Sequence, residues 1–513
     1  MTPRCLALLP VVLLAAGSLR AQTAAAPTAH AAAGSLSAAV ATITGGDVMR
    51  RVGIIADDSM MGRDTPSRGL ELTAKYVADE FRRFGLKPGG DSGTWFQRYP
   101  ITRRQLQLRG SEVVFQAGRV AARAGLDRSA RFVTGSVPAG PLAGPAIVLG
   151  GPLTPDAVGG MALRDKVVLY VPDYRSPIPA NSGQVLRAIR MGGPRAIVSL
   201  ANLDSAAFAA RVPPFAPERY GLDLGSGVPP NVEVSEMTVA PALRAAGIDL
   251  DRIRDAGQVV GRDVPSLAVK VDLRDSVLSK TTAPNTIGIL EGSDPKLRGE
   301  YLVFSAHMDH IGITPGQRDS INNGADDDGS GTTGVIELAE AFSRPGVRPA
   351  RSILFITVSG EEKGLWGSRY FSEHPTVPLD HIVADLNIDM IGRNWKDTVV
   401  AIGKEHSDLG TTLNRVNAAH PELGMTAIDD IWPQESFYTR SDHYNFARKG
   451  VPILFFFNGT HPDYHRPGDE VSKIDGEKES RIVKLVFYLG LEIANAKDKP
   501  KWNPKSYQEI VGQ

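Results

Sequence analysis

The chain has 513 residues, 42% of them hydrophobic, and its 57 basic side chains balance 57 acidic ones. This length exceeds what one hydrophobic core usually serves, so we expect two domains with extensions. The lack of net charge argues against a nucleic-acid partner, because binding to a polyanion needs a basic surface. The composition is otherwise that of an ordinary globular protein.

The N-terminal residues are typical of an export signal. Arg4 supplies a positive charge, residues 5–16 form an apolar run of signal-peptide length, and Ala21 offers a small residue at a cleavage position. We therefore predict a signal peptide over residues 1–22 and a secreted or periplasmic protein. The alternative is a membrane anchor, which is disfavoured because the run is shorter than the ~20 residues of a spanning helix. No membrane span is expected in the mature protein.

Two features of the N-terminal region limit what the mature protein can contain. Residues 23–43 are rich in Ala, Ser and Thr, which predicts a flexible leader. The only cysteine, Cys5, lies within the predicted signal. The mature protein would then have no thiol, and any metal that it binds must be held by His, Asp and Glu side chains.

The rest of the chain divides into an α/β domain and an insert. Residues 44–125 contain a helical pattern over 70–84, and we assign them with residues 263–513 to one domain. Between these parts, residues 126–262 carry short apolar segments punctuated by Pro and Gly, which predict a separate β-rich insert. Its predicted elements are strands over 145–150, 166–171 and 195–200 and a helix over 183–192.

Residues 263–513 alternate apolar strand patterns with helical ones. This order is typical of a mixed, mostly parallel sheet sandwiched between helices. The predicted strands are residues 301–307, 352–360, 381–389 and 451–457, and the predicted helices are residues 331–342, 408–420 and 480–496.

Each of these apolar strands ends at a potential metal ligand. His307 ends the first strand, Glu361 and Glu362 follow the second, Asp389 ends the third, and His465 lies a short loop beyond the fourth. Ligands of open α/β sheets bind outside the carboxyl ends of the strands, so these side chains are expected to meet there. A further acidic cluster, Asp326, Asp327 and Asp328, lies between the first strand and its helix.

Several carboxylates at the edge of a dry core repel one another, so a cation must offset them. Two His and several carboxylates suit zinc, and one bridging carboxylate can hold a pair of ions. Asp309 can accept the other ring N–H of His307 and orient it. Each of these candidate ligands, considered alone, is more typical of an ordinary surface or turn position than of a metal site. The three consecutive aspartates do not match the spacing of a calcium-binding loop. The shared position of the candidate ligands at strand ends favours the metal site.

Five segments resemble, in order, the signatures of the M28 family of zinc peptidases: SAHMDHIG, NNGADDDGSGTTGVIELAEAF, SGEEKGLWGS, LNIDMIGR and DYHRPGDE. The insert is similar to the protease-associated (PA) domain often found in such enzymes. The resemblance implies that Asp326 bridges two zinc ions, and that the Asp326–Asp327 peptide bond is cis. It also implies that His307 and Asp389 complete one site, that Glu362 and His465 complete the other, and that Glu361 is the general base.

We therefore expect a secreted aminopeptidase with two Zn²⁺ per chain that acts on peptides with a free N-terminus. Three alternatives remain open: a glutaminyl cyclase of the same fold, a dipeptidase or carboxypeptidase, and a non-catalytic peptide-binding protein. Arg393, Arg440 and Arg466 lie near the motifs and are the candidates for the carboxylate clamp that a carboxypeptidase needs. The sequence indicates neither the preferred N-terminal residue nor the oligomeric state.

Overall fold

The computed structural model describes residues 36–172, 182–213, 216, 218–222, 224, 228–316 and 318–512. The predicted signal peptide, residues 1–22, lies outside these ranges, as does the predicted leader up to residue 35. At the end of that leader, residues 36–40 are helical, and Ala39, Val40 and Ile43 are buried in the main core.

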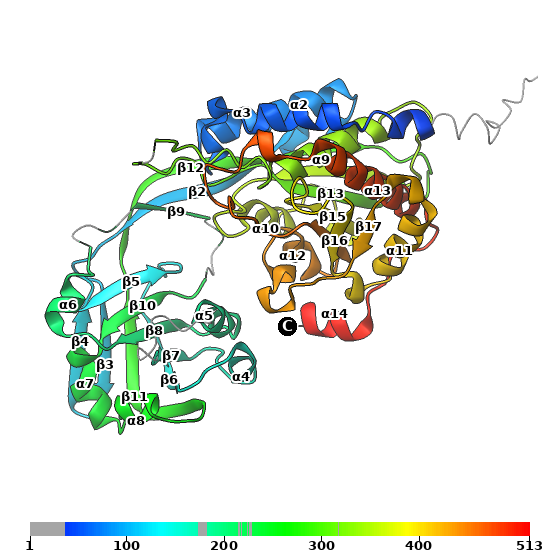
Figure 1. Cartoon of the computed structure of the whole chain (residues 1–513). Helices are drawn as coiled ribbons and strands as arrows, with labels where there is room; N and C mark the ends of the chain where they lie inside the picture. The colour runs from blue at the N-terminus through cyan, green and yellow to red at the C-terminus, as the bar shows by residue number, and fades with distance from the viewer. Residues whose placement is uncertain are drawn as a thin grey trace, which may run out of the picture.

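The first domain is built on a ten-stranded mixed sheet in the order β17-β16-β18-β15-β13-β14-β12-β2-β9, with β1 paired to β12 (Figure 1). Its centre is parallel and lies within two residues of the predicted strands: β14 (Ser352–Val358), β13 (Tyr301–His307), β15 (Ile382–Ile388) and β18 (Ile453–Phe457). The remaining strands are β1 (Lys87–Pro88), β2 (Phe96–Leu106), β9 (Glu218–Leu222), β12 (Asp275–Leu290), β16 (Thr398–Ile402) and β17 (Thr426–Ile428). The predicted mixed α/β fold is confirmed.

Helices cover both faces of this sheet because alternate residues of its central strands point to opposite sides. Leu302, Phe304 and Ala306 pack under one layer, whereas Val303 joins the core on the other face. The first layer consists of α2 (Gly45–Ile55), α3 (Arg68–Arg83), α9 (Gly329–Phe342), α11 (Leu409–Ala419) and α13 (Gly476–Asn495); the second of α10 (Trp366–Glu373), α12 (His443–Ala447) and α14 (Pro504–Ile510) (Figure 1). Within the described ranges, no helix combines the length and the hydropathy needed to cross a bilayer.

The second domain has its own eight-stranded sheet, in the order β4-β3-β11-β6-β7-β8-β10-β5. Strands β6, β7, β8 and β10 are parallel to one another, so this domain is α/β rather than purely β-rich. Its strands are β3 (Glu112–Ala117), β4 (Val120–Gly125), β5 (Ala130–Thr134), β6 (Leu142–Gly150), β7 (Val167–Tyr170), β8 (Ala196–Ala201), β10 (Asn231–Ser235) and β11 (Val260–Asp272). Its helices are α4 (Pro155–Gly159), α5 (Ser182–Met191), α6 (Ser205–Ala209), α7 (Glu236–Ala245) and α8 (Leu250–Arg254).

The second sheet extends beyond the predicted insert of residues 126–262. It already includes β3 and β4, and it continues through the end of β11 at Asp272. Conversely, β9 comes from the insert sequence but pairs with β2 of the first sheet. The long strands β2 and β12 pair with each other where the chain passes between the domains (Figure 1). Strand pairing decides to which of the two sheets each strand belongs, and a local sequence pattern does not encode this pairing.

Candidate active site

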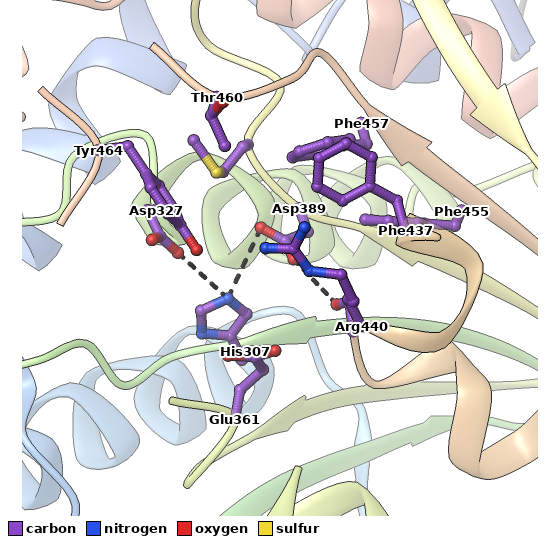
Figure 2. A pocket seen from close by; sticks show the side chains of 12 residues that line it. His307, Asp327, Glu361, Asp389, Phe437, Arg440, Phe455, Phe457, Thr460 and Tyr464 are labelled. Carbon is purple, nitrogen blue, oxygen red and sulfur yellow. Dashed lines mark hydrogen bonds and ion pairs between the residues drawn. The ribbon is translucent and has the colours of Figure 1, made fainter. Parts of the chain in front are cut away.

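The carboxyl ends of the central strands bring the predicted site residues together. His307 is the last residue of β13, Asp389 follows β15, and Glu361 and Glu362 follow β14 after a Ser-Gly turn. His465 lies in the loop after β18 in a left-handed conformation with φ of 56°. Figure 2 shows that His307, Asp389, Asp327 and Glu361 point toward a common space. Together with His465, these side chains come from the carboxyl ends of four strands, β13, β14, β15 and β18, and the loops that follow them.

Asp327 occupies the centre of this arrangement. Its Oδ1 lies 3.4 Å from Nε2 of His307, and that nitrogen lies 3.6 Å from Oδ1 of Asp389. On the other side, Oδ2 of Asp327 lies 3.2 Å from Nε2 of His465, which is 3.1 Å from Oε2 of Glu362. One carboxylate therefore faces two separate His–carboxylate pairs, one through each oxygen.

The central aspartate is Asp327 and not Asp326, as the family resemblance had implied. Oδ1 of Asp326 accepts a hydrogen bond from the Gly392 N–H at 2.7 Å, and its Oδ2 lies 3.3 Å from Nε2 of His461. The cis peptide bond is correspondingly one position later than predicted, between Asp327 and Asp328. Asp469 accepts the backbone N–H groups of both Asp326 and Asp327, and this turns the Asp326 side chain away from the site.

The geometry around Asp327 fits a pair of divalent cations. Two ligand atoms that each lie ~2.0–2.1 Å from a tetrahedral zinc are about 3.3–3.4 Å apart, which is close to the four separations above. Among the described residues, Oδ2 of Asp327 and Oδ1 of Asp389 are buried and accept no hydrogen bond. Buried oxygens without a donor are costly unless a cation satisfies them. The donor set of two His and three carboxylates is also one that zinc accepts.

Two further side chains lie close enough to contribute a ligand atom. Asp328 groups with His307 and Asp389 within 4.8 Å, and His310 groups with Asp327 and Glu362. The oxygens of Asp328 are already occupied, because they accept the backbone N–H groups of His307, Gly331 and Met390. His310 is buried, and its Nδ1 lies 2.8 Å from Oε1 of Glu362. Sequence reasoning missed His310, although it is the second histidine of HMDH.

Asp309 supports the site in a different way from that predicted. Nδ1 of His307 is 3.2 Å from the backbone carbonyl of Asp309, while the Asp309 carboxylate is 3.7 Å away. That carboxylate instead accepts a hydrogen bond from Thr65 Oγ1 at 3.0 Å and from the Glu361 N–H at 3.2 Å. The main chain of Asp309 therefore orients His307, and its side chain holds the start of the Glu361 loop.

Glu361 differs from its neighbour Glu362 in having no side-chain partner within the part of the chain that the structure describes. Burial raises the pKa of the Glu361 carboxyl well above its ordinary value, and repulsion from Glu362, Asp442 and Asp389 adds to this, although His307 opposes it. A carboxylate with a raised pKa and no side-chain partner, beside a cluster of candidate metal ligands, is a candidate for a general base.

One wall of the site is apolar and aromatic. Met390, Phe437, Phe455 and Phe457 line the cavity opposite His307, and Phe437 lies 4.8 Å from Phe457 between ring centres (Figure 2). Tyr464 closes another side and stacks on His465 at 3.9 Å. This pocket is assembled from separate loops, so the sequence offered only the run of phenylalanines in β18 as a signal.

The arginines near the site are largely occupied by other groups. Arg440 lines the cavity, but it pairs with Glu435 at 3.3 Å and lies over the Phe437 ring at 4.6 Å. Arg393 donates to Asp463 at 2.8 Å and to Nδ1 of His461 at 3.2 Å. Arg466 is exposed. Ion pairing with local acids therefore accounts for Arg393 and Arg440.

The second domain also reaches the rim of the cavity. Nε2 of Gln184 in α5 donates to the Gln434 carbonyl at 3.3 Å, and Arg187 donates to Oγ1 of Thr439. Thr439 is the neighbour of Arg440, which lines the cavity. The two domains thus meet beside the opening of the site.

The site residues described above lie in a segment that is similar to a known protein family. Residues 285–490 match the profile of Peptidase family M28. This segment is similar to M28 peptidase domains. It contains His307, Asp327, Glu361, Glu362, Asp389 and His465, so every residue of the arrangement above lies inside the matched segment.

Part of the chain is also similar to named relatives. The chain is 27% identical over 239 residues to Aminopeptidase YwaD of Bacillus subtilis, covering 45% of this chain and 49% of the relative. It is 28% identical over 221 residues to a probable leucine aminopeptidase of Arthroderma benhamiae, covering 42% and 58%. The match thus spans about half the length of these curated relatives. A solved zinc aminopeptidase from Bacillus subtilis aligns with 18% identity and a TM-score of 0.48, covering 89% of this chain and 96% of the other.

Proposed function

We propose that the protein is an exported zinc aminopeptidase that removes N-terminal residues from peptides. The observation that carries the proposal is the position of Asp327 between His307 with Asp389 and His465 with Glu362, with Glu361 unpaired beside them. The match to family M28 and the names of the relatives support the same activity.

Five side chains would hold two zinc ions. His307 and Asp389 would bind one, His465 and Glu362 the other, and Asp327 would contribute one oxygen to each. Zinc supplies Lewis acidity, which lowers the pKa of water and polarises a peptide carbonyl. Ser441 donates from Oγ to Oδ2 of Asp389 at 2.9 Å and so directs the other oxygen of that carboxylate toward His307.

Glu361 would move the proton in the hydrolysis. Its carboxylate accepts a proton from the attacking water and later returns it to the departing amine. The raised pKa of Glu361 makes the carboxylate a stronger base than an exposed glutamate.

The charges of the site favour a free N-terminus over a C-terminal carboxylate. Glu361, Glu362 and Asp389 create a field that attracts an ammonium group. A carboxypeptidase needs a free basic clamp, whereas Arg440 and Arg393 are paired with Glu435 and Asp463. The wall of Met390 and three phenylalanines suits a large apolar first residue.

A substrate panel with metal analysis tests the proposal. Leucyl and phenylalanyl nitroanilides should be cleaved, chelation should abolish the activity, and zinc should restore it at two ions per chain. N-acetylation should remove at least ~2 kcal/mol of transition-state stabilisation, roughly thirtyfold in kcat/KM. Equal cleavage of acetylated substrates, or release of C-terminal residues first, contradicts aminopeptidase action. One zinc with cyclisation of N-terminal glutamine indicates a glutaminyl cyclase, and metal binding without turnover indicates a binding protein.

Two further parts of the proposal concern the remainder of the chain. We propose that residues 1–22 are a signal peptide that directs export, which N-terminal sequencing of the mature protein tests. A mature N-terminus at Met1 contradicts it. We also propose that the second domain is of the PA type and limits access to the site, supported by the contacts of Gln184 and Arg187 with the cavity rim.

A further inference from the structure

Residues 61–65, which are far in sequence from the predicted motifs, contact the loops that carry the site residues. This segment lies at the end of the 3₁₀ helix η1 (Asp58–Arg63), and the Arg63 side chain within it is completely buried. A buried arginine usually pairs with a carboxylate. Within the described ranges, the hydrogen bonds of Arg63 instead end on backbone carbonyls: those of Ile55, Met308, Asn323, Gly324 and Asp327.

Apart from that of Ile55 in α2, these carbonyls belong to the loop between β13 and α9, which follows His307 and carries Asp327. Nε of Arg63 donates to Met308, the residue after His307, at 2.9 Å. Nη2 donates to Gly324 at 2.9 Å and to Asp327 itself at 3.4 Å. A single planar guanidinium therefore joins the two ends of this loop, one next to His307 and the other at Asp327. The rigid fork of arginine suits such a connection, and the three donors of lysine on one nitrogen do not reproduce it.

The backbone adopts an unfavourable conformation to place this side chain. Met61, Gly62 and Arg63 have φ values of 51°, 67° and 52°, a run of three left-handed residues. For a residue with a Cβ this region is unfavourable, because the Cβ comes too close to the following carbonyl oxygen. At Gly62 a Cβ would lie 2.6 Å from the carbonyl oxygens of Asn322 and Gly312, so a side chain there has no room. Strain of this kind persists where the surroundings enforce it, and it often marks functional sites.

The next residues of the segment reach a second loop of the site. Thr65 donates from Oγ1 to Asp309 at 3.0 Å and accepts the Gly360 N–H at 3.1 Å, next to Glu361. Asp64 pairs with Lys363 at 2.6 Å. The segment thus contacts both the loop after β13, which carries Asp327, and the loop after β14, which carries Glu361 and Glu362.

We propose that Arg63 is a positioning residue for the metal site, and that its guanidinium sets the spacing between His307 and Asp327. This inference rests on the proposed zinc function. Arg63 touches neither substrate nor metal in this role, and it acts through the carbonyls of Met308, Gly324 and Asp327. Its positive charge also lies among four carboxyl groups, Asp309, Asp327, Asp328 and Asp469, and so reduces their mutual repulsion.

The chain contains a matched control for this role. Arg351 is also almost fully buried, and it also donates to backbone carbonyls, those of Ile493 and Ala496, besides Glu300. It precedes β14 and therefore lies at the opposite end of the strands from the site. Arg63→Lys and Arg351→Lys both keep a positive charge and both remove a buried fork of donors. Only Arg63→Lys removes donors that bind the loop carrying the proposed metal ligands.

The experiment compares these two variants with the full-length wild-type protein. Zinc affinity is measured by chelator competition, the cobalt-substituted site by its visible absorption spectrum, and the stability of the metal-free protein by its Tm. We expect both variants to lower Tm, but only Arg63→Lys to weaken zinc binding, by about 10–100-fold as for other residues that orient ligands, and to change the cobalt spectrum. Arg63→Gln, measured in the same way, replaces Arg63→Lys if the latter does not fold.

Three results overturn the inference, and the first two leave the proposed function standing. If the wild type binds two zinc ions and the Arg63 variants match Arg351→Lys in affinity and spectrum, Arg63 serves stability alone. The same conclusion follows if neither Arg63 variant folds while Arg351→Lys does. If the wild type itself binds no zinc, the proposed function fails and the role of Arg63 with it.

Discussion

Replacing Asp327 by asparagine should weaken metal binding, whereas the same replacement of its neighbour Asp326 should leave it nearly unchanged. Asp327→Asn and Asp326→Asn each replace one carboxylate oxygen by an amide of nearly the same size and remove one negative charge. Asp327 faces Nε2 of His307 at 3.4 Å and Nε2 of His465 at 3.2 Å. Asp326 faces Gly392 and His461. We expect the first change to weaken both zinc sites and the second to leave two zinc ions bound.

The size of the effect follows from the charge that is lost. A unit charge about 4 Å from another is worth ~4 kcal/mol at an effective dielectric constant of ~20, which corresponds to about a thousandfold in affinity. Part of this is recovered because asparagine keeps one carbonyl oxygen as a ligand. We therefore expect Asp327→Asn to weaken each zinc site at least a hundredfold. Asp326→Asn keeps an acceptor for the Gly392 N–H and should change zinc affinity by less than about tenfold.

Metal content after dialysis against buffered free zinc measures the stoichiometry, and chelator competition measures the affinity of each site. The Tm of the metal-free variants controls for general unfolding, since both residues are buried in the same loop. Loss of zinc from Asp326→Asn with retention by Asp327→Asn would refute the reasoning. So would equal loss from both variants at unchanged Tm, because the two side chains face different groups.

Three further predictions concern the base, the core and the second domain. Glu361→Gln should lower kcat by about 10²–10⁴-fold while two zinc ions remain bound, and loss of metal from this variant contradicts the role of a base. Arg51→Met should lower the free energy of unfolding by about 3–5 kcal/mol in urea, because Arg51 is the buried partner of Glu80, Glu337 and Glu340; a change below ~1 kcal/mol disagrees with this. Arg187→Ala, which removes the contact with Thr439, should alter KM for a tripeptide more than for an aminoacyl nitroanilide. Equal changes for both substrates argue against a role in access.

The sequence alone determined the parts of the site that local patterns encode. A run of buried apolar residues specifies a strand, and its length places the next polar residue at the end of that strand. Local patterns therefore suffice to place His307, Glu361, Glu362 and Asp389 at one sheet edge. Helix α9 was equally predictable, since its apolar pattern is continuous and Asp328 caps its first turn.

Only the tertiary structure decided between Asp326, Asp327 and Asp328. Three consecutive aspartates carry the same local signal, and their side chains are sorted by partners elsewhere in the chain: Asp469, Gly392 and Met390. Arg63 lies 245 residues before the carbonyl of Met308 that it binds, so no local pattern connects them. The aromatic wall and the extent of the second domain were decided in the same way. Contacts between segments distant in sequence depend on how strands pair and loops close, and local propensity does not carry that information.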